Sequence, residues 1–194
     1  MPRTPAQNKV IKDKRKEKLL KKSLKVFATR SYDEITVDDI TNEANCAHGL
    51  FYHYFENKAE AYDGITQRMA GRKFASRLPK FEEAKELGGF KAIQFLVREI
   101  LNATKEDDEI VYYVLLCGYR HFIHDPLVKT PDYFLDIKKW VKDAQKQGKV
   151  REGTAEEVTL ILVDTINGML RRRIIQGESF KPLKEETILS LIAK

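Results

Sequence analysis

The chain has 194 residues, of which 42% are hydrophobic and 33% are charged, and its formal net charge is +6. This length suits one ordinary domain, or a small domain joined to a larger one. No run of about 18 apolar residues is present, and the N-terminal residues lack an apolar core with a cleavage site, so we expect neither a membrane span nor a secretory signal. The two cysteines, Cys46 and Cys117, provide no disulfide framework, and we expect a cytoplasmic protein.

The positive charge is concentrated near the N-terminus. Residues 1–30 contain eleven Lys or Arg side chains against Asp13 and Glu17, a net charge of +9, so the remaining residues sum to −3. Taken alone, such a run is most simply a solvated face that keeps a protein soluble. Beside the segment that follows, a basic arm instead indicates binding to a polyanion.

Residues 35–44 carry the signals of a short helix. Thr36 is suited to be its N-cap, and Asp39 stands three residues later, close to the pattern of a capping box. The helical pattern ends at Ala44. Asn45 follows, and asparagine tolerates the left-handed backbone conformation that a tight turn requires.

A second short helix is predicted from about Ala47 to Phe55. Its spacing directs Leu50 and Phe51 toward the core. Polar, aromatic and imidazole groups are left on the other face, and core packing does not explain them, whereas a surface that enters a DNA groove does. Asn57 caps a third helix, with Glu60 three residues later. Helix, turn, helix and a capped third helix together predict a helix-turn-helix.

This region resembles the TetR family of transcriptional regulators. The residues that carry the resemblance are Phe27-Ala28, Tyr32, Thr36-Val37, Ile40, Ala44, Gly49, the run Phe51-Tyr52-His53-Tyr54-Phe55, and Asn57-Lys58. The match is strong over roughly residues 15–65 and rests on length and helical pattern elsewhere. It implies a helix-turn-helix DNA-binding domain over residues 1–57 and a helical effector-binding and dimerisation domain over residues 58–194.

The resemblance also implies which residues contact DNA. The phosphate contacts would be Thr36, Tyr52, Tyr54 and Lys58, and the residues nearest the bases would be Ala47, His48, Gly49 and His53. Three positions depart from the family pattern: Asn45 replaces a glycine, Cys46 a branched aliphatic residue, and Ala47 a serine or threonine cap. His48 stands where lysine or arginine is common, so base readout should differ from that of typical members.

Beyond residue 57 the chain reads as further helices, which makes the expected fold class all-α with about nine helices. The helix from Asn57 is expected to break at Pro79, and Gly88-Gly89 marks the next break. The remaining helices are predicted at about 90–104, 109–124, 132–147, 155–177 and 183–193.

In the resembled family the last two helices pair with those of a second subunit. Residues 158–175 carry apolar groups on more than one face, as expected of a helix buried on two sides. We therefore expect a homodimer through residues 155–193, with Leu162 and Met169 at the interface, on a near-palindromic DNA operator. The alternative is a buried helix within a monomer.

Aromatic residues in the C-terminal region indicate either core or a cavity for an apolar or amphipathic small-molecule effector. Asp164 and Asn167 also lie inside an otherwise apolar helix, where buried polar groups need partners that Arg120 or a ligand can supply. The proposed effector-binding residues are Phe95, Tyr113, Leu116, Cys117, Arg120, Phe134, Trp140, Asp164 and Asn167.

Motifs for catalysis, metal or cofactor binding were not found. His121 and His124 have a spacing that can hold a metal, but no third ligand follows from the sequence. We therefore expect no metal, no cofactor and no enzymatic activity. The leading interpretation is a homodimeric DNA-binding repressor released by a small molecule. The alternative is an all-helical enzyme or scaffold that uses its N-terminal segment as an interaction module.

Overall fold

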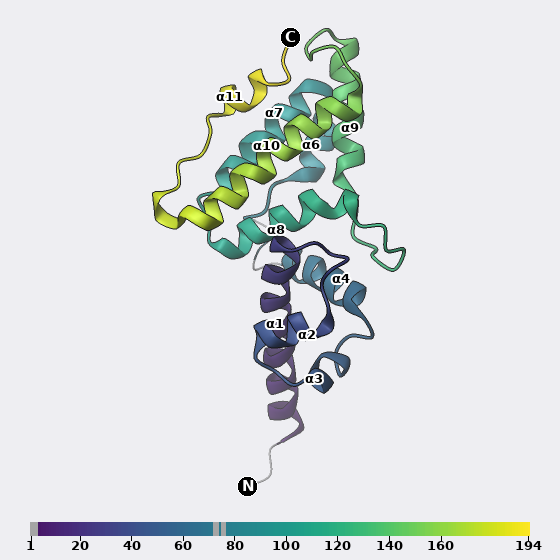
Figure 1. Ribbon diagram of the computed structural model, residues 1–194, viewed down its shortest axis with the longest axis vertical. Coiled ribbons are helices and arrows are strands. Elements are labelled where there is room, and N and C mark those ends of the chain that lie inside the picture. Colours follow the sequence, from purple (N-terminus) through teal and green to yellow (C-terminus); the bar gives the residue numbers. More distant parts are fainter. Residues whose placement is uncertain (1–3, 72–73, 75–76) are drawn as a thin grey trace. The chain divides into compact units, whose positions relative to one another are not determined.

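The computed structural model describes residues 4–71, 74 and 77–194, and most of these residues lie in helices (Figure 1). They form ten α-helices, two short 3-10 helices and one isolated antiparallel bridge between Val150 and Ala193. The predicted all-α class is confirmed. Two compact units are present, one made of residues up to Gly71 with 123–130, the other of 72–122 with 131–194. The first unit thus extends past residue 57.

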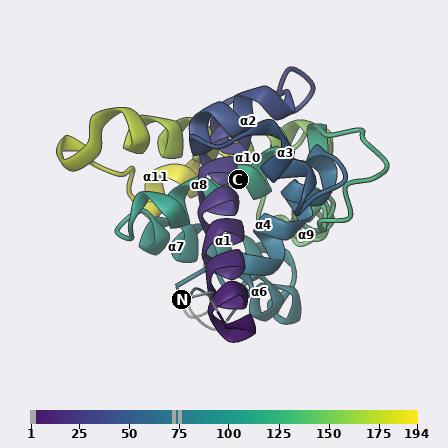
Figure 2. The ribbon, with the colours of Figure 1, turned by 90° about the horizontal axis from the view of Figure 1, so that it is seen from below.

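The first unit is built around α1 (Pro5–Thr29), which packs against both α2 (Val37–Ala44) and α4 (Lys58–Met69) (Figures 1 and 2). From Leu19 onward α1 contributes most of its apolar side chains to the core. The turns before Leu19 are exposed except for the half-buried Ile11. The basic half of α1 is therefore held as a regular helix with its charges in solvent.

The helix-turn-helix forms as predicted, with a shorter second helix. Thr36 caps α2 and completes a capping box with Asp39, while Asn45 adopts the left-handed conformation at φ 49°. The second helix, α3 (His48–Tyr52), ends before the predicted Phe55. The reason is that the chain must become extended again by Asn57, which caps α4 at φ −156°.

Helix α4 approaches α1 closely because it carries a glycine at the contact. A Cβ on Gly64 would lie 3.2 Å from Leu20 Cδ2 and 3.3 Å from Phe55 Cε1. Helix α4 ends at Met69 and does not run to Pro79 as predicted. Of the predicted continuation, residues 72, 73, 75 and 76 lie outside the described part of the chain.

The second unit contains the remaining helices. Their bounds are α6 (Phe81–Leu87), α7 (Gly89–Ala103), α8 (Asp108–Tyr119), α9 (Tyr133–Lys146), α10 (Ala155–Gln176) and α11 (Glu185–Ser190). Helix α9 packs against α7 and α10, α10 also contacts α8, and α11 lies against α7 (Figure 1). The predicted break falls at Gly88, whose positive φ of 63° ends α6 and starts α7.

Two predicted helices are shorter than expected. Helix α8 ends at Tyr119, and a 3-10 turn over Arg120–Phe122 replaces its last turn ahead of Pro126. Helix α11 stops at Ser190 because the last residues pair with residues 149–151 through backbone hydrogen bonds. No helix in the described part of the chain is both long and apolar enough to cross a membrane.

Helix α10 has one face in the core of its own unit and one face in solvent. Leu162 and Met169 are only 1% and 3% exposed within the single chain, so they belong to the core and not to the exposed face. Both residues were predicted at a subunit interface, and their burial within the single chain corrects that prediction. The exposed residues of α10 and its end include Asp164, Gly168, Arg172 and Ile175.

Candidate nucleic-acid interface

Helix α3 presents a continuous exposed face. All four residues that the resemblance places nearest the bases are exposed on or beside α3: Ala47, His48, Gly49 and His53. Tyr52, the proposed phosphate contact on the same helix, is exposed as well. Phe51, on the opposite side, is fully buried and fixes α3 to the core. A Cβ added to Gly49 would meet nothing within 4 Å, so the backbone itself forms the surface there. Another macromolecule can approach α3 closely at this point.

The aromatic rings of this face are in edge-to-face contact with one another. The ring of His48 meets the edge of the Tyr52 ring with centroids 5.2 Å apart, and Tyr52 in turn meets buried Phe51 at 5.4 Å. His48 Nε2 also lies 3.5 Å from Asp38 Oδ1 in the first turn of α2. These contacts orient the imidazole of His48 on the α3 surface.

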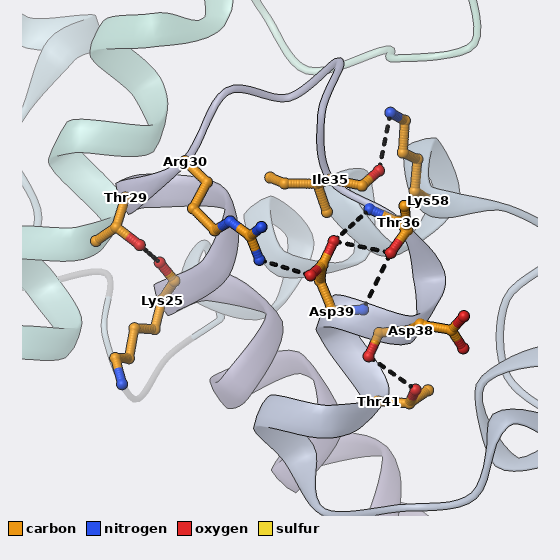
Figure 3. A network of polar contacts seen from close by, with 9 residues as sticks. All are labelled: Lys25, Thr29, Arg30, Ile35, Thr36, Asp38, Asp39, Thr41 and Lys58. Carbon is orange, nitrogen blue, oxygen red and sulfur yellow. Dashed lines mark hydrogen bonds and ion pairs between the residues drawn. The ribbon is translucent and has the colours of Figure 1, made fainter.

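The N-terminus of α2 is a closed hydrogen-bond network (Figure 3). The Thr36 hydroxyl donates to Asp39 at 2.7 Å and accepts from the Asp39 backbone N–H at 3.2 Å. Asp39 also accepts from Arg30 at 2.7 Å. The backbone and hydroxyl of Thr36, followed by Arg30, lower the pKa of Asp39 from 3.8 to about 2. The Thr36 hydroxyl, a proposed phosphate contact, is engaged as a cap.

Tyr54 is also engaged within the first unit. Its hydroxyl donates to the backbone carbonyl of Lys12 on α1 at 3.0 Å. The ammonium group of Lys16, one turn later, lies 5.3 Å from the centroid of the Phe55 ring. The basic, exposed half of α1 is thereby held beside the residues that follow α3.

Lys58 is the fourth proposed phosphate contact, and its ammonium points back into its own unit. It donates to the carbonyl oxygens of Tyr32 at 2.7 Å and Ile35 at 3.2 Å, with Asp33 at 3.4 Å. The same ammonium lies 4.4 Å from the centroid of the Tyr32 ring. The contact with Ile35 is drawn in Figure 3.

One part of this unit, the segment 123–130, could not be predicted from local sequence patterns. The Tyr32 hydroxyl donates to Asp125 Oδ2 at 2.8 Å, and burial, together with Asp125, raises the pKa of Tyr32. Asp63 on α4 accepts from the backbone N–H groups of Lys129 and Thr130. These pairs are too far apart in sequence for any local pattern to reveal them.

The second unit brings together part of the proposed effector site. Cys117 is half-buried beside Tyr113, and desolvation raises the pKa of its thiol to about 12. Burial and the nearby Cys117 likewise raise the pKa of Tyr133 to about 12. Phe81 connects this group to Trp140, with ring centroids 4.0 Å from Tyr133 and 5.2 Å from Trp140. Tyr133 and Phe81 were missed because their partners lie on other helices.

Other proposed effector residues lie apart from this cluster or are tightly enclosed. Asn167 is only 3% exposed and packs against α8. A Cβ added to Gly118 on α8 would lie 2.3 Å from Asn167 Oδ1. Its Nδ2 has no hydrogen-bond partner among the described residues. Asp164 is exposed on α10, so it does not line the same enclosed space as Asn167. Leu116 is buried on α8, while Phe95 and Arg120 are half-buried.

His121 and His124, which were considered as a metal-binding pair, belong to different units. His121 hydrogen-bonds to Asp132 at 2.8 Å and stacks on Phe134 with centroids 4.0 Å apart. His124 is exposed in the segment that belongs to the first unit. Among the described residues, no group of three or more His, Cys, Asp or Glu side chains is arranged to hold a metal ion.

The geometry of α1 to α4 defines a helix-turn-helix DNA-binding unit. A family profile described as "Bacterial regulatory proteins, tetR family" matches residues 19–63 of the chain, which span the helix-turn-helix and the start of α4. Residues 19–63 are therefore a TetR-family DNA-binding segment. The chain as a whole has the fold of a TetR-family transcriptional regulator. The resemblance found in the sequence is confirmed.

Solved structures agree on the fold. HlyIIR, a hemolysin II transcriptional regulator, is 19% identical with a TM-score of 0.59, covering 94% of this chain and 99% of its own. SmeT, the repressor of the Stenotrophomonas maltophilia multidrug efflux pump SmeDEF, is 16% identical with a TM-score of 0.53, covering 92% of this chain and 90% of its own. A TetR-family regulator from Shewanella sp. PV-4 is 15% identical with a TM-score of 0.52, covering 93% and 98%. The comparison with curated proteins gave no match.

Proposed function

We propose that the protein is a homodimeric, non-enzymatic repressor that binds a near-palindromic operator through α3 and is released by a small-molecule effector. The observation that carries the proposal is the exposed face of α3, which gathers His48, Tyr52 and His53 around a bare backbone at Gly49. A short helix of this kind, presented after a tight turn, fits the major groove.

Within this proposal the contacts divide by chemistry. His48 and His53, with Ala47 and Gly49, face the base edges, and imidazole nitrogens can donate to or accept from them. Tyr52 reaches a phosphate from the same face. Since phosphate contacts carry no sequence information, loss of Tyr52 should weaken all sequences similarly. The positive charge that draws DNA comes from the exposed lysines and arginines of α1 between residues 9 and 18.

A dimer would place two copies of α3 on the two half-sites of the operator. The exposed face of α10, with Gly168 and Ile175, is the surface we propose for the partner subunit. Ile175 is 84% exposed, so its apolar side chain is available to be buried against a partner. A Cβ on Gly168 would meet nothing within 4 Å, so another helix can come close there.

The effector proposal rests on the aromatic cluster of the second unit around Tyr113, Cys117, Tyr133 and Trp140. SmeT, which shares the fold, has been solved as a complex with triclosan. An apolar or amphipathic molecule of that kind is the class we propose here. Such an effector can release DNA only if it binds more tightly to a conformation in which the two α3 helices of the dimer do not match the spacing of the half-sites. Cys117→Trp should then blunt the response to the effector while leaving the DNA affinity of the free protein nearly intact.

The decisive experiment is selection of bound duplexes from a random DNA pool. A symmetric site with two half-sites about one helical turn apart supports the proposal. The same selection with His48→Ala should recover a different preferred base within each half-site, and an unchanged site would remove α3 from the groove. If the segment is instead an interaction module of an enzyme or scaffold, no duplex will be enriched and no steep salt dependence will appear.

A further inference from the structure

We infer that α10 pairs with α10 of a second copy of the chain in an antiparallel register centred on Gly168. Asp164 of each subunit then meets Arg171 and Arg172 of the other, and these charges select the partner. The register rests on the proposed homodimer and adds to it the residues that specify the pairing. Both the register and the charge selection can be measured without DNA.

The outward face of α10 surrounds Gly168. Residues three, four or seven positions apart share one face of a helix. On the face of Gly168 these positions are Ile161, Asp164, Arg171, Arg172 and Ile175, of which Ile161 is half-buried and the others are exposed. The opposite face of α10 supplies the core of the second unit. The outward face therefore remains available to a partner.

The chemistry of this face is symmetric about Gly168. Ile161 stands seven residues before the glycine and Ile175 seven residues after it, while Asp164 stands four before and Arg172 four after. In a two-fold contact, residue i of one subunit meets residue j of the other, and j meets i. An antiparallel pair centred on Gly168 therefore brings each Ile161 to the partner's Ile175, and each Asp164 to the partner's Arg172.

The charges exclude the opposite direction of pairing. In a parallel pair the same residues would face their own copies, so that carboxylate would meet carboxylate at Asp164 and guanidinium would meet guanidinium at Arg172. Like charges placed together across an interface are unfavourable and suppress wrong partners. The antiparallel register converts both repulsions into attractions.

The two guanidinium groups are held at the surface without a carboxylate of their own. Arg171 lies 5.1 Å from the centroid of the Tyr119 ring, and Arg172 lies 5.5 Å from that of Phe180 and donates to a backbone carbonyl at 3.3 Å. Neither forms an ion pair with any described residue. Arg173, by contrast, turns inward and pairs at 3.3 Å with the first carboxylate of α8. Arg171 and Arg172 thus keep their charge for a partner.

Gly168 lets the two helices approach closely at the centre of the contact. A Cβ at this position would meet nothing within 4 Å, so no group of the same subunit requires the glycine. The missing side chain does permit the close approach of another backbone. At a rise of about 1.5 Å per residue, the ion pairs would lie ~6 Å and the isoleucine contacts ~10 Å from this centre.

The first experiment exchanges charges between two chains. Asp164→Arg places arginine opposite arginine, and the double variant Arg171→Asp with Arg172→Asp places carboxylate opposite carboxylate. Each variant alone should dimerise at least roughly tenfold more weakly than the wild type in sedimentation. Their mixture restores both ion pairs, so native mass spectrometry should show a heterodimer. Glu86→Arg and Lys142→Asp, which reverse exposed charges elsewhere in the same unit, are the controls and should dimerise as the wild type does.

The second experiment measures the register with a short bismaleimide cross-linker. In the antiparallel pair the two copies of position 161 lie about 21 Å apart along the helices, and so do the two copies of position 175. Ile161→Cys and Ile175→Cys should therefore each stay uncross-linked alone, and cross-link when mixed and allowed to exchange subunits. In a parallel pair each variant would cross-link to itself. The wild type, which carries Cys46 and Cys117, measures the background.

Three results would overturn the inference: charge variants that dimerise as tightly as the wild type, a mixture that forms no heterodimer, or cross-linking of either cysteine variant by itself. Circular dichroism checks that each variant is folded. If a charge variant is not, the cysteine variants decide, because they retain Asp164 and both arginines. A wild type that is monomeric in the micromolar range would instead remove the proposed homodimer, whereas a wild-type dimer insensitive to the charge exchange would remove only the register.

Discussion

The hydroxyl of Thr130 donates a 2.7 Å hydrogen bond to the carboxylate of Asp63 on α4. The same carboxylate accepts from the backbone N–H groups of Thr130 and Lys129, each at 2.9 Å. Thr130 is buried, so its two donors have limited access to water. One side chain of the DNA-binding unit therefore fixes the end of the segment 123–130.

Replacing Asp63 with alanine should remove the carboxylate that accepts from the backbone N–H of buried Thr130. The cost of such an unsatisfied group is about 1–3 kcal/mol, so the free energy of unfolding of Asp63→Ala should fall by that amount. Hydrogen exchange at the amides of Lys129 and Thr130 should accelerate with it. Gln67→Ala, an exposed change on the same helix, serves as the control. Unchanged protection of both amides would show that the carboxylate does not anchor the segment.

Gly49→Ala should separate stability from DNA binding. Alanine is favoured over glycine within a helix by about 1 kcal/mol, and nothing in the chain lies within 4 Å of the new Cβ, so the variant should be as stable as the wild type or more stable. On the operator, the added methyl group occupies the space of the closely approaching base edges. We expect at least a tenfold weaker affinity, measured by titration of labelled duplex. A more stable variant with wild-type affinity would show that α3 does not approach DNA at Gly49.

The capping box of α2 should make the protein sensitive to acid in a defined window. The pKa of Asp39 is lowered in the folded state from 3.8 to about 2, so the carboxylate contributes stability above about pH 4 that is lost as the pH falls toward 2. Urea unfolding followed between pH 5 and pH 2 should therefore show a steeper decline for the wild type than for Asp39→Asn. Parallel curves would mean that Asp39 has no special environment.

Thr36→Ala removes the other half of the same cap and tests it at neutral pH. Loss of an N-cap hydroxyl costs about 1 kcal/mol. The variant should unfold at lower urea, and its operator affinity should fall because the start of α2 loosens. If stability falls by that amount while the salt slope stays constant, Thr36 acts as a cap rather than through a phosphate.

Ile175→Glu should weaken the dimer. Placing a charge on the proposed α10 interface buries it without a partner, so sedimentation should show more monomer and operator affinity should fall with it. Leu135→Glu changes a residue of α9 that is 56% exposed and serves as the control. Dimer content equal to that of the control would move the interface away from this face.

Local signals in the sequence determined most of the secondary structure. The cap at Thr36, the left-handed turn at Asn45, the break at Gly88 and the start of α10 at Ala155 all follow from residues within one turn of each boundary. The exposed face of α3 also followed, because helical periodicity alone separates buried Phe51 from His48 and Tyr52. These features could be predicted because helix capping and helical periodicity depend only on residues that are close in sequence.

Tertiary structure alone decided how individual polar groups are used. Lys58 turns to the carbonyls of the loop 32–35, and Tyr54 to that of Lys12, although both residues fit the pattern of phosphate contacts. Leu162 faces its own core rather than a partner subunit. The segment 123–130 joins the DNA-binding unit through Asp63. Each of these outcomes depends on which distant groups the packed helices bring within hydrogen-bonding or van der Waals range, and that distance is not encoded in any local pattern.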